Sequence, residues 1–254
     1  MPTTKAAFFD QDGVIIDTER DGHRVAFNRA FEEFGFDVNW DVEKYHQLLQ
    51  IGGGKERMKH HLHEEGFGKE IVPDQEDPLI QTLHKRKTDI FIEMIESGQL
   101  PLRPGVHRIM REINREHLLL GVCTTSAERA AQAIVRGALG DIRIDLVLAG
   151  DVVKNKKPDP EIYLLALART GLDPAACIVF EDSSNGVKAA KGAGMHVVAT
   201  VNQYTRDEDL SLADIVVSCL GDEGAEQAEV LSSKREFHVD GIVRLSNLIS
   251  YFER

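Results

Sequence analysis

The chain has 254 residues, of which 42% are hydrophobic and 28% charged, the composition of a soluble globular protein that buries a core. Its formal net charge of −12 argues against nucleic acid or an anionic membrane surface as a partner, because both would repel it. Three dispersed cysteines without a C-x-x-C pair indicate neither a disulfide framework nor a zinc site, and no apolar run approaches the roughly 20 residues of a membrane helix. We therefore expect a cytoplasmic protein that is not inserted in a membrane.

Short apolar runs that alternate with longer amphipathic stretches predict an α/β core. Because these runs are apolar on both faces, they indicate buried parallel strands in a Rossmann-like sheet. A capping-box pattern at Thr125–Glu128 predicts a helix that ends near Gly140, and a second helix is expected over 184–193. Residues 221–234, rich in Asp, Glu, Gly and Ser, are expected to be a solvated excursion before a last helix at 242–252. The predicted strands are 6–9, 118–123, 146–149, 177–180, 196–201 and 215–220.

An all-helical insert is expected between the first two strands. Apolar residues recur with helical period over 21–34, 41–49, 54–65 and 77–96, with no convincing strand between them. We therefore expect a core domain formed by residues 1–18 and 99–254, and a helical cap domain formed by residues 19–98.

Two pairs of acidic residues follow predicted strands. Asp10 and Asp12 end the first run, directly before Gly13, and alternation along a strand would send both carboxylates to the same side. Alone, this pattern is more typical of a solvated turn. Glu181 and Asp182 end another buried run, however, and two such pairs can converge at the carboxyl edge of a sheet. Such an oxygen-ligand cage is what Mg²⁺ selects.

Two further side chains fit the same site. Thr124 follows the strand at 118–123, so its hydroxyl and nearby backbone amides could hold an anionic oxygen. Lys157 lies in a loop stiffened by Pro158 and Pro160, where its ammonium could neutralise both a carboxylate and a bound phosphate. Individually, a strand end and a solvated charge run explain these residues; the combination favours a site.

Together, Asp10-Gln11-Asp12-Gly13-Val14, Thr124, Lys157 and Glu181-Asp182 resemble the four ordered motifs of the haloacid dehalogenase superfamily. The resemblance implies that Asp10 is the nucleophile that forms an aspartyl-phosphate and Asp12 the general acid and base. It implies that Thr124 and Lys157 hold the phosphoryl oxygens. It also implies a Mg²⁺ site formed by Asp10, the backbone carbonyl of Asp12, Glu181 and Asp182. Within this superfamily, Asp12 and Asp182 imply phosphoryl transfer rather than dehalogenation, because a halide leaves without protonation and true dehalogenases lack both the second acid and the Mg²⁺ site.

The insert resembles the small helical cap, of the C1 type, on which substrate choice depends in this superfamily. Its Gly52-Gly53-Gly54-Lys55-Glu56-Arg57 segment either brings backbone amides and positive charge to a ligand or forms a flexible hinge before an ordinary helix. With the return segment at 102–105, the insert resembles the CbbY-type sugar-phosphate phosphatases, which hydrolyse xylulose 1,5-bisphosphate. The substrate contacts that we expect are Glu19, His23, Gly53, Gly54, Lys55, Arg57, Arg103 and Thr125.

The function expected from the sequence is therefore a Mg²⁺-dependent phosphatase that hydrolyses xylulose 1,5-bisphosphate to xylulose 5-phosphate through an aspartyl-phosphate. A hexose phosphomutase of the β-phosphoglucomutase kind and a broader sugar monophosphate phosphatase are the alternatives. A non-catalytic binding protein on the same scaffold is a third class, disfavoured because all the motif positions are intact. We expect a monomer whose partner is a small phosphorylated sugar.

Overall fold

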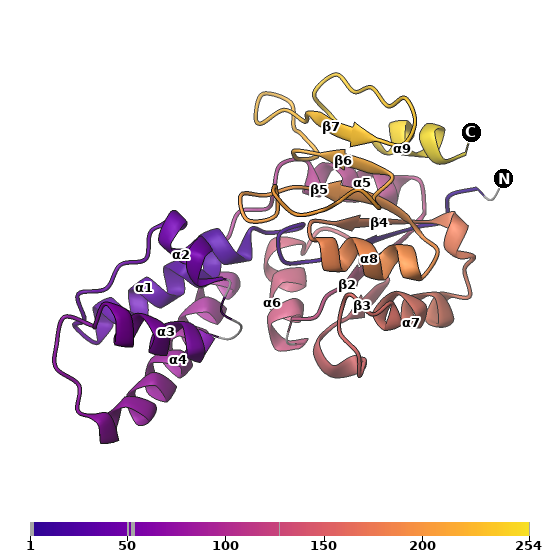
Figure 1. Cartoon of the computed structure of the whole chain (residues 1–254). Coiled ribbons are helices and arrows are strands. Elements are labelled where there is room, and N and C mark those ends of the chain that lie inside the picture. Colours follow the sequence, from indigo (N-terminus) through magenta and orange to yellow (C-terminus); the bar gives the residue numbers. More distant parts are fainter. Residues whose placement is uncertain (1–2, 50, 52–53, 127, 254) are drawn as a thin grey trace. The chain divides into compact units, whose positions relative to one another are not determined.

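The computed structural model describes residues 3–49, 51, 54–126 and 128–253, which form two compact units (Figure 1). One unit contains Met1–Asp17 and Pro101–Arg254, and the other contains Thr18–Leu100. Among the described residues, no helix has both the length and the apolar character needed to cross a bilayer.

The larger unit is built on a mainly parallel sheet, which confirms the expected α/β fold. In the part of the chain described, the sheet has seven strands in the order β3-β2-β1-β4-β5-β6-β7. Strand β1 lies in the interior of the sheet, and its neighbours β2 and β4 are both parallel to it. The chain thus extends the sheet in opposite directions from β1, and the carboxyl ends beside such a reversal are where open α/β sheets bind ligands. The strands are β1 (Ala6–Phe9), β2 (Leu119–Cys123), β3 (Leu146–Leu148), β4 (Cys177–Glu181), β5 (His196–Thr200), β6 (Ile215–Val217) and β7 (Val230–Ser233).

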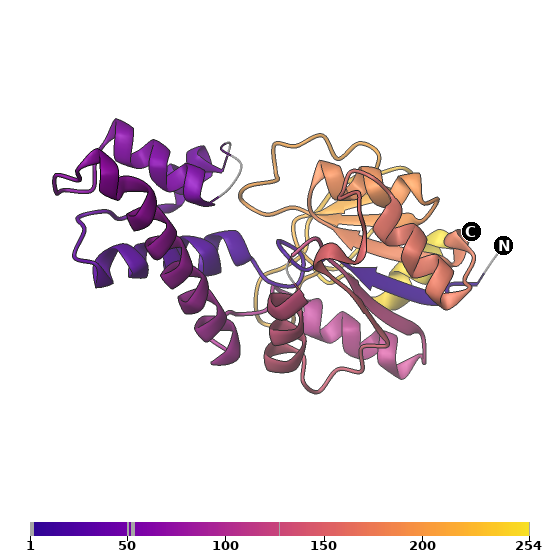
Figure 2. The ribbon, with the colours of Figure 1, turned by 90° about the horizontal axis from the view of Figure 1, so that it is seen from below.

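Helices cover both faces of this sheet, as the two views show (Figures 1 and 2). Alternate strand residues, such as Ala6 and Phe8 of β1, pack in one cluster with Tyr163 of α7 and Ala190 of α8. The residues between them, such as Phe9, face the opposite layer, which contains α5 and α9. Both faces are therefore apolar, which explains the continuous hydrophobic runs. The helices of this unit are α5 (Val106–Arg115), α6 (Glu128–Ala138), α7 (Glu161–Thr170), α8 (Ser184–Gly192) and α9 (Leu245–Phe252), with short 3-10 turns at Gly150–Val152 and Pro174–Ala176.

Two local expectations for this unit need comment. The predicted solvated excursion at 221–234 contains strand β7, which pairs antiparallel with β6, so that part of the prediction is wrong. The strand was missed because it lies at the sheet edge and exposes most of its side chains, including Leu231. Helix α6 begins at Glu128, and the residue before it lies outside the described residues, so the capping box at Thr125 stays a prediction.

The smaller unit is helical and has an aromatic core of its own. Phe27 and Phe31 pack against Trp40, with ring centroids 4.9 and 5.0 Å apart, and Tyr45 and Phe67 complete the cluster. The unit starts with a π-helical turn, η1 (Thr18–His23), that leads directly into α1 (Arg24–Glu33). The other helices are α2 (Val42–Leu48), α3 (Gly54–Glu64) and α4 (Pro73–Glu96).

Candidate active site

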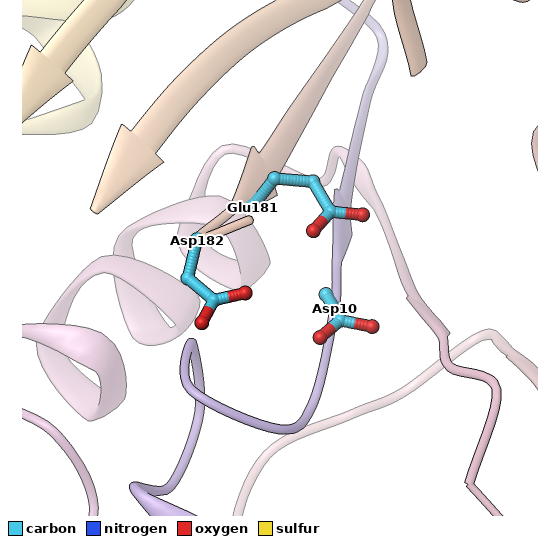
Figure 3. A group of neighbouring side chains, drawn as sticks. All are labelled: Asp10, Glu181 and Asp182. Atoms are coloured by element: carbon cyan, nitrogen blue, oxygen red, sulfur yellow. The ribbon is translucent and has the colours of Figure 1, made fainter. Parts of the chain in front are cut away.

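Three carboxylates meet at the carboxyl edge of the sheet. Asp10 directly follows β1, and its backbone N–H donates to Phe180 O of β4 at 2.9 Å. Because Glu181 ends β4 and Asp182 follows it, this register brings both acids beside Asp10 (Figure 3). One oxygen from each of the three residues lies within 4.8 Å of the others, and all three residues are buried.

Lys157 joins two of these carboxylates. Its Nζ lies 2.6 Å from Asp10 Oδ1 and 2.7 Å from Glu181 Oε1, and it also donates to Cys123 O of β2 at 3.0 Å. Burial alone would lower the pKa of Lys157, but the carboxylates of Asp10 and Glu181 raise it above its ordinary value. The charged form of Lys157 is therefore favoured, and its ammonium restrains Asp10 Oδ1 while leaving Oδ2 available.

The Glu181 carboxylate is held on one side and left open on the other. Its Oε1 accepts from Lys157 and from the buried Tyr163 hydroxyl, whereas Oε2 has no hydrogen-bond partner although it is buried. A Cβ placed on Gly186 would come within 1.9 Å of that Oε2, so only glycine at this position of α8 leaves room for the carboxylate. An orphaned carboxylate oxygen in such a place requires a ligand.

Asp182 is oriented by Asn202, which follows β5. Asn202 Nδ2 donates to Asp182 Oδ2 at 2.7 Å. Burial, together with the charges of Asp10 and Glu181, raises the pKa of Asp182 well above its usual range. Burial likewise raises the pKa of Asp10 to about 7, despite the opposing effect of Lys157. Burial is the larger cause of both shifts, and the neighbouring carboxylates add to it, so ionising Asp10 and Asp182 together is unfavourable without further positive charge.

The donor set fits a divalent cation. Three carboxylates against one ammonium leave a deficit of two positive charges, and oxygen donors are those that hard divalent cations prefer. The orphaned Glu181 Oε2 supports the same conclusion, since a cation or its bound water would satisfy it. Asp10, Glu181 and Asp182 therefore form a buried acidic cluster whose oxygen donors suit a divalent metal.

Asp12 lies beside this cluster and contacts the segment after β2. Its Oδ2 accepts from Thr124 Oγ1 at 3.4 Å and from the Ser126 hydroxyl. The Ser126 backbone N–H in turn donates to Thr124 Oγ1 at 3.1 Å, which tightens the turn that positions both hydroxyls. A cavity of about 280 Å³ opens over this arrangement. It is lined by Asp10, Asp12, Thr125, Lys157, Glu181, Asp182, Ser183 and Asn185.

Arg103, which the sequence analysis expected to contact the substrate, binds the backbone of the larger unit. Its guanidinium donates to the backbone carbonyls of Gly13, Thr200, Val201 and Ser218, and also to Thr200 Oγ1 at 2.9 Å. Because these acceptors are oxygens of the larger unit's own chain, Arg103 already has its hydrogen-bond partners there. These hydrogen bonds give Arg103 a structural role in the larger unit, and a direct contact with the substrate stays a prediction.

In the smaller unit, Glu19 and Arg57 are connected through Tyr45, which the sequence analysis did not select. The Tyr45 hydroxyl donates to Glu19 Oε2 at 2.7 Å, and Arg57 Nη1 donates to the same hydroxyl at 3.3 Å. The guanidinium carbon of Arg57 lies 5.7 Å from the Tyr45 ring centroid, and Arg57 Nε donates to Ile51 O. Three elements, η1, α2 and α3, thus contribute to one polar cluster.

A second missed residue, Lys87 of α4, lies beside His23. Its Nζ is 3.0 Å from His23 Nδ1 and 4.5 Å from the Phe27 ring centroid, and only 7% of the residue is exposed. Burial, followed by the charge of Lys87, lowers the pKa of His23 well below its ordinary value, so His23 is neutral and its Nδ1 accepts. Burial also lowers the pKa of Lys87, to about 8, against an opposing effect of Glu19. Among the described residues of this unit, the buried ammonium contacts His23 and the Phe27 ring rather than a carboxylate.

The remaining predicted contacts of this unit are less closely gathered. Lys55 is exposed and lines a separate cavity of about 620 Å³ together with Gln81, His84 and Lys85. Gly54 is packed closely, since a Cβ there would lie 2.9 Å from His84 Nε2 and 3.0 Å from Phe27 Cζ. Gly53 lies outside the described residues.

The chain is similar in sequence to known hydrolases and phosphatases. Residues 4–194 match the family model described as haloacid dehalogenase-like hydrolase. A CBBY-like protein of Arabidopsis thaliana is 45% identical over 229 residues, which cover 89% of this chain and 72% of the relative. A phosphorylated carbohydrates phosphatase of Thermotoga maritima is 32% identical, over 80% of this chain and 88% of the relative.

Among solved structures, a mutant of CbbY from Rhodobacter sphaeroides in complex with xylulose-(1,5)bisphosphate matches with a TM-score of 0.67. It is 36% identical in sequence, and the match covers 87% of this chain and 96% of that one. The sheet and its helices are therefore shared with a protein whose crystals contain a phosphorylated sugar.

Proposed function

The chain belongs to the haloacid dehalogenase-like hydrolases and is a phosphatase of that family, and from this premise we propose that it hydrolyses xylulose 1,5-bisphosphate in a Mg²⁺-dependent reaction. The observation that carries the proposal is the buried cluster in which Lys157 bridges Asp10 and Glu181 beside Asp182. A nucleophilic carboxylate, a fixed ammonium and a cation site at one sheet edge are the requirements of phosphoryl transfer by an aspartate.

In the first step, Asp10 Oδ2 attacks the phosphorus atom while Lys157 holds Oδ1. The phosphorus–oxygen bond to the sugar breaks, and Asp12 gives its proton to the leaving alkoxide. Thr124 and Ser126 hold the Asp12 carboxyl for this transfer. The products of the step are an aspartyl-phosphate on Asp10 and the dephosphorylated sugar position.

In the second step, Asp12 takes a proton from a water molecule, which attacks the phosphorus of the aspartyl-phosphate. The bond between phosphorus and Asp10 breaks, inorganic phosphate leaves, and both aspartates return to their starting states. Asp10, the backbone carbonyl of Asp12, Asp182 and, directly or through water, Glu181 would hold Mg²⁺, which would supply positive charge that stabilises the transferring phosphoryl group. Lys157 contributes to the same stabilisation of the transition state.

We propose further that the smaller unit recognises the rest of the substrate. The buried Lys87 ammonium, which lies beside the neutral His23, and the Arg57 guanidinium supply positive charge that suits a second phosphate. Glu19, fixed by Tyr45, suits sugar hydroxyls as a hydrogen-bond acceptor. The choice of a ketose bisphosphate follows the similarity to the CbbY complex.

Phosphate release from a panel of sugar monophosphates and bisphosphates tests this proposal. Xylulose 1,5-bisphosphate should have the highest kcat/KM, and the Asp10→Asn variant should lose essentially all turnover of every substrate. Turnover of xylulose 1,5-bisphosphate no better than that of simple monophosphates would refute the substrate. Interconversion of β-glucose 1-phosphate and glucose 6-phosphate without net phosphate release would instead identify a phosphomutase.

A further inference from the structure

Arg103 connects three segments of the larger unit that are far apart in the sequence. Its Nη1 donates to Gly13 O in the loop after β1, and to Thr200 O and Oγ1 at the end of β5, at 3.1 and 2.9 Å. Its Nη2 donates to Val201 O, just beyond β5, and to Ser218 O, just beyond β6, at 3.3 Å. Arg103 itself is fixed, since its backbone N–H donates to Ile15 O at 2.9 Å.

Two of these segments position residues of the phosphatase site. Gly13 directly follows Asp12, so the carbonyl that Arg103 holds belongs to the peptide after the proposed general acid and base. Val201 directly precedes Asn202, whose Nδ2 donates to Asp182 Oδ2 at 2.7 Å. Two of the carbonyls that Arg103 binds therefore belong to sequence neighbours of site residues. Gly13 is next to Asp12, and Val201 is next to Asn202, which binds Asp182.

The same two segments also contact each other beneath Asp182. Gly13 has a φ of +79°, and a Cβ on it would lie 2.0 Å from Asp182 Oδ2 and 2.7 Å from Asn202 Nδ2. Because these atoms are closely packed, a shift of the Gly13 peptide would also move the Asp182 carboxylate or the Asn202 amide. The position of the Gly13 carbonyl is consequently coupled to the geometry of the cation site.

We propose that Arg103 is a positioning residue that fixes the Asp12–Gly13 loop against the ends of β5 and β6 and thereby sets the geometry of Asp12 and Asp182. It acts through the backbone and does not touch the substrate. A planar guanidinium suits this task because one rigid group reaches acceptors on several strand ends at once, which a lysine ammonium on a flexible stem does less well. The inference rests on the phosphatase chemistry proposed above.

Arg108 provides a matched control within the same unit. It too is a partly buried arginine that donates to backbone carbonyls, Leu220 O at 2.9 Å and Gly221 O at 2.8 Å. Its ion pairs are with Glu112 and Asp222, which take no part in the proposed chemistry. Replacing Arg108 therefore removes a similar set of structural hydrogen bonds without releasing the Asp12–Gly13 loop.

The test compares Arg103→Met, Arg103→Lys and Arg108→Met with the full-length wild-type chain. Titration calorimetry with Mg²⁺ alone measures cation affinity, and p-nitrophenyl phosphate hydrolysis measures kcat and KM for the folded fraction. Arg103→Met should weaken Mg²⁺ binding by roughly 10- to 100-fold, the range seen when residues that orient metal ligands are removed. It should also lower kcat more than it changes KM, with Arg103→Lys intermediate and Arg108→Met close to wild type.

Several results would overturn the proposal. Wild-type Mg²⁺ affinity and kcat in both Arg103 variants would show that Arg103 does not determine the geometry of Asp12 and Asp182. Equal losses of Mg²⁺ affinity and kcat in Arg108→Met would show a general effect of lowered stability. A rise in KM alone in the Arg103 variants would indicate that Arg103 contacts the substrate directly. Should Arg103→Met fail to fold, Arg103→Lys carries the comparison. Because Mg²⁺ binding is read without substrate, a wild-type chain that binds Mg²⁺ but hydrolyses no phosphate ester refutes the proposed function separately.

Discussion

Replacing Lys87 should make the folded chain more stable but weaken its binding of the phosphorylated substrate. Burial lowers the pKa of Lys87 from 10.5 to about 8, and each unit of pKa shift corresponds to about 1.4 kcal/mol. Holding the ammonium in place at pH 7 therefore destabilises the folded chain by about 3 kcal/mol relative to an unperturbed lysine. Replacement by methionine removes the buried charge and keeps most of the side-chain volume. We expect Lys87→Met to be more stable at pH 7 by about 1–3 kcal/mol, after the loss of the ring contacts with Phe27 and Phe91.

The pH dependence of stability should differ between the two chains in a defined direction. Between about pH 8 and pH 10.5 the unfolded chain keeps the proton on Lys87, whereas the folded chain has lost it. Since stability rises with pH wherever the unfolded state binds more protons, the free energy of unfolding of the wild type should rise by up to about 1.4 kcal/mol per pH unit in that window. Lys87→Met lacks this contribution, so its advantage should shrink as the pH increases.

The single tryptophan makes the measurement specific. Trp40 lies fully buried in the core of the smaller unit, so its fluorescence reports unfolding of the unit that contains Lys87. Urea unfolding at pH 7 and pH 9.5 should be followed for the wild type, Lys87→Met and, as the matched control, Lys85→Met, which replaces an exposed lysine on the same helix. A Lys87→Met variant that is less stable than the wild type at pH 7, or whose advantage is the same at both pH values, would contradict this account of the buried ammonium.

Two further outcomes concern the cation site of the larger unit. Gly186→Ala should weaken Mg²⁺ binding about tenfold or more, because the new Cβ would come within 1.9 Å of Glu181 Oε2 and displace that carboxylate. Titration calorimetry measures the affinity, and an unchanged value would argue against a role for Glu181 in binding the cation. Gly192→Ala, in the same helix but beside Pro160, is the control and should bind Mg²⁺ like the wild type. Chelation by EDTA should abolish phosphate release and excess Mg²⁺ should restore it, because Lys157 alone leaves the three carboxylates uncompensated; activity that survives exhaustive chelation would exclude the cation from the reaction.

Part of the site was predictable because three of its residues follow strands directly. Asp10, Thr124 and Asp182 are placed by the ends of three neighbouring parallel strands, so finding the strands in the sequence located the side chains. The partners that orient them were not predictable in the same way. Tyr163 lies on α7 and Asn202 in the loop after β5, and only the packing of these elements brings them to Glu181 and Asp182.

Lys87 and Arg103 show two roles that the sequence alone did not reveal. Lys85 and Lys87 are two positions apart on one helix, about 200° around its axis, so one side chain is exposed and the other buried. The sequence alone cannot show which of the two faces α1. Arg103 was predicted as a substrate contact from the resemblance of the return segment, but most of its acceptors are backbone carbonyls, which every residue has and which no sequence pattern marks.

Taken separately, the two units contain uncompensated charges of opposite sign, and this should make their ligands distinguishable by mutation. The larger unit has excess carboxylate charge that suits Mg²⁺, and the smaller has a buried ammonium that suits a phosphate group. In the Asp10→Asn background, which should not turn over, xylulose 1,5-bisphosphate at about 100 times its Kd should raise the free energy of unfolding by about 2.7 kcal/mol. Adding Lys87→Met should reduce that gain while leaving the increase caused by Mg²⁺ alone unchanged. If Lys87→Met left the gain from the bisphosphate intact, the assignment of the second phosphate to the smaller unit would be refuted, although the chemistry at Asp10 would stand.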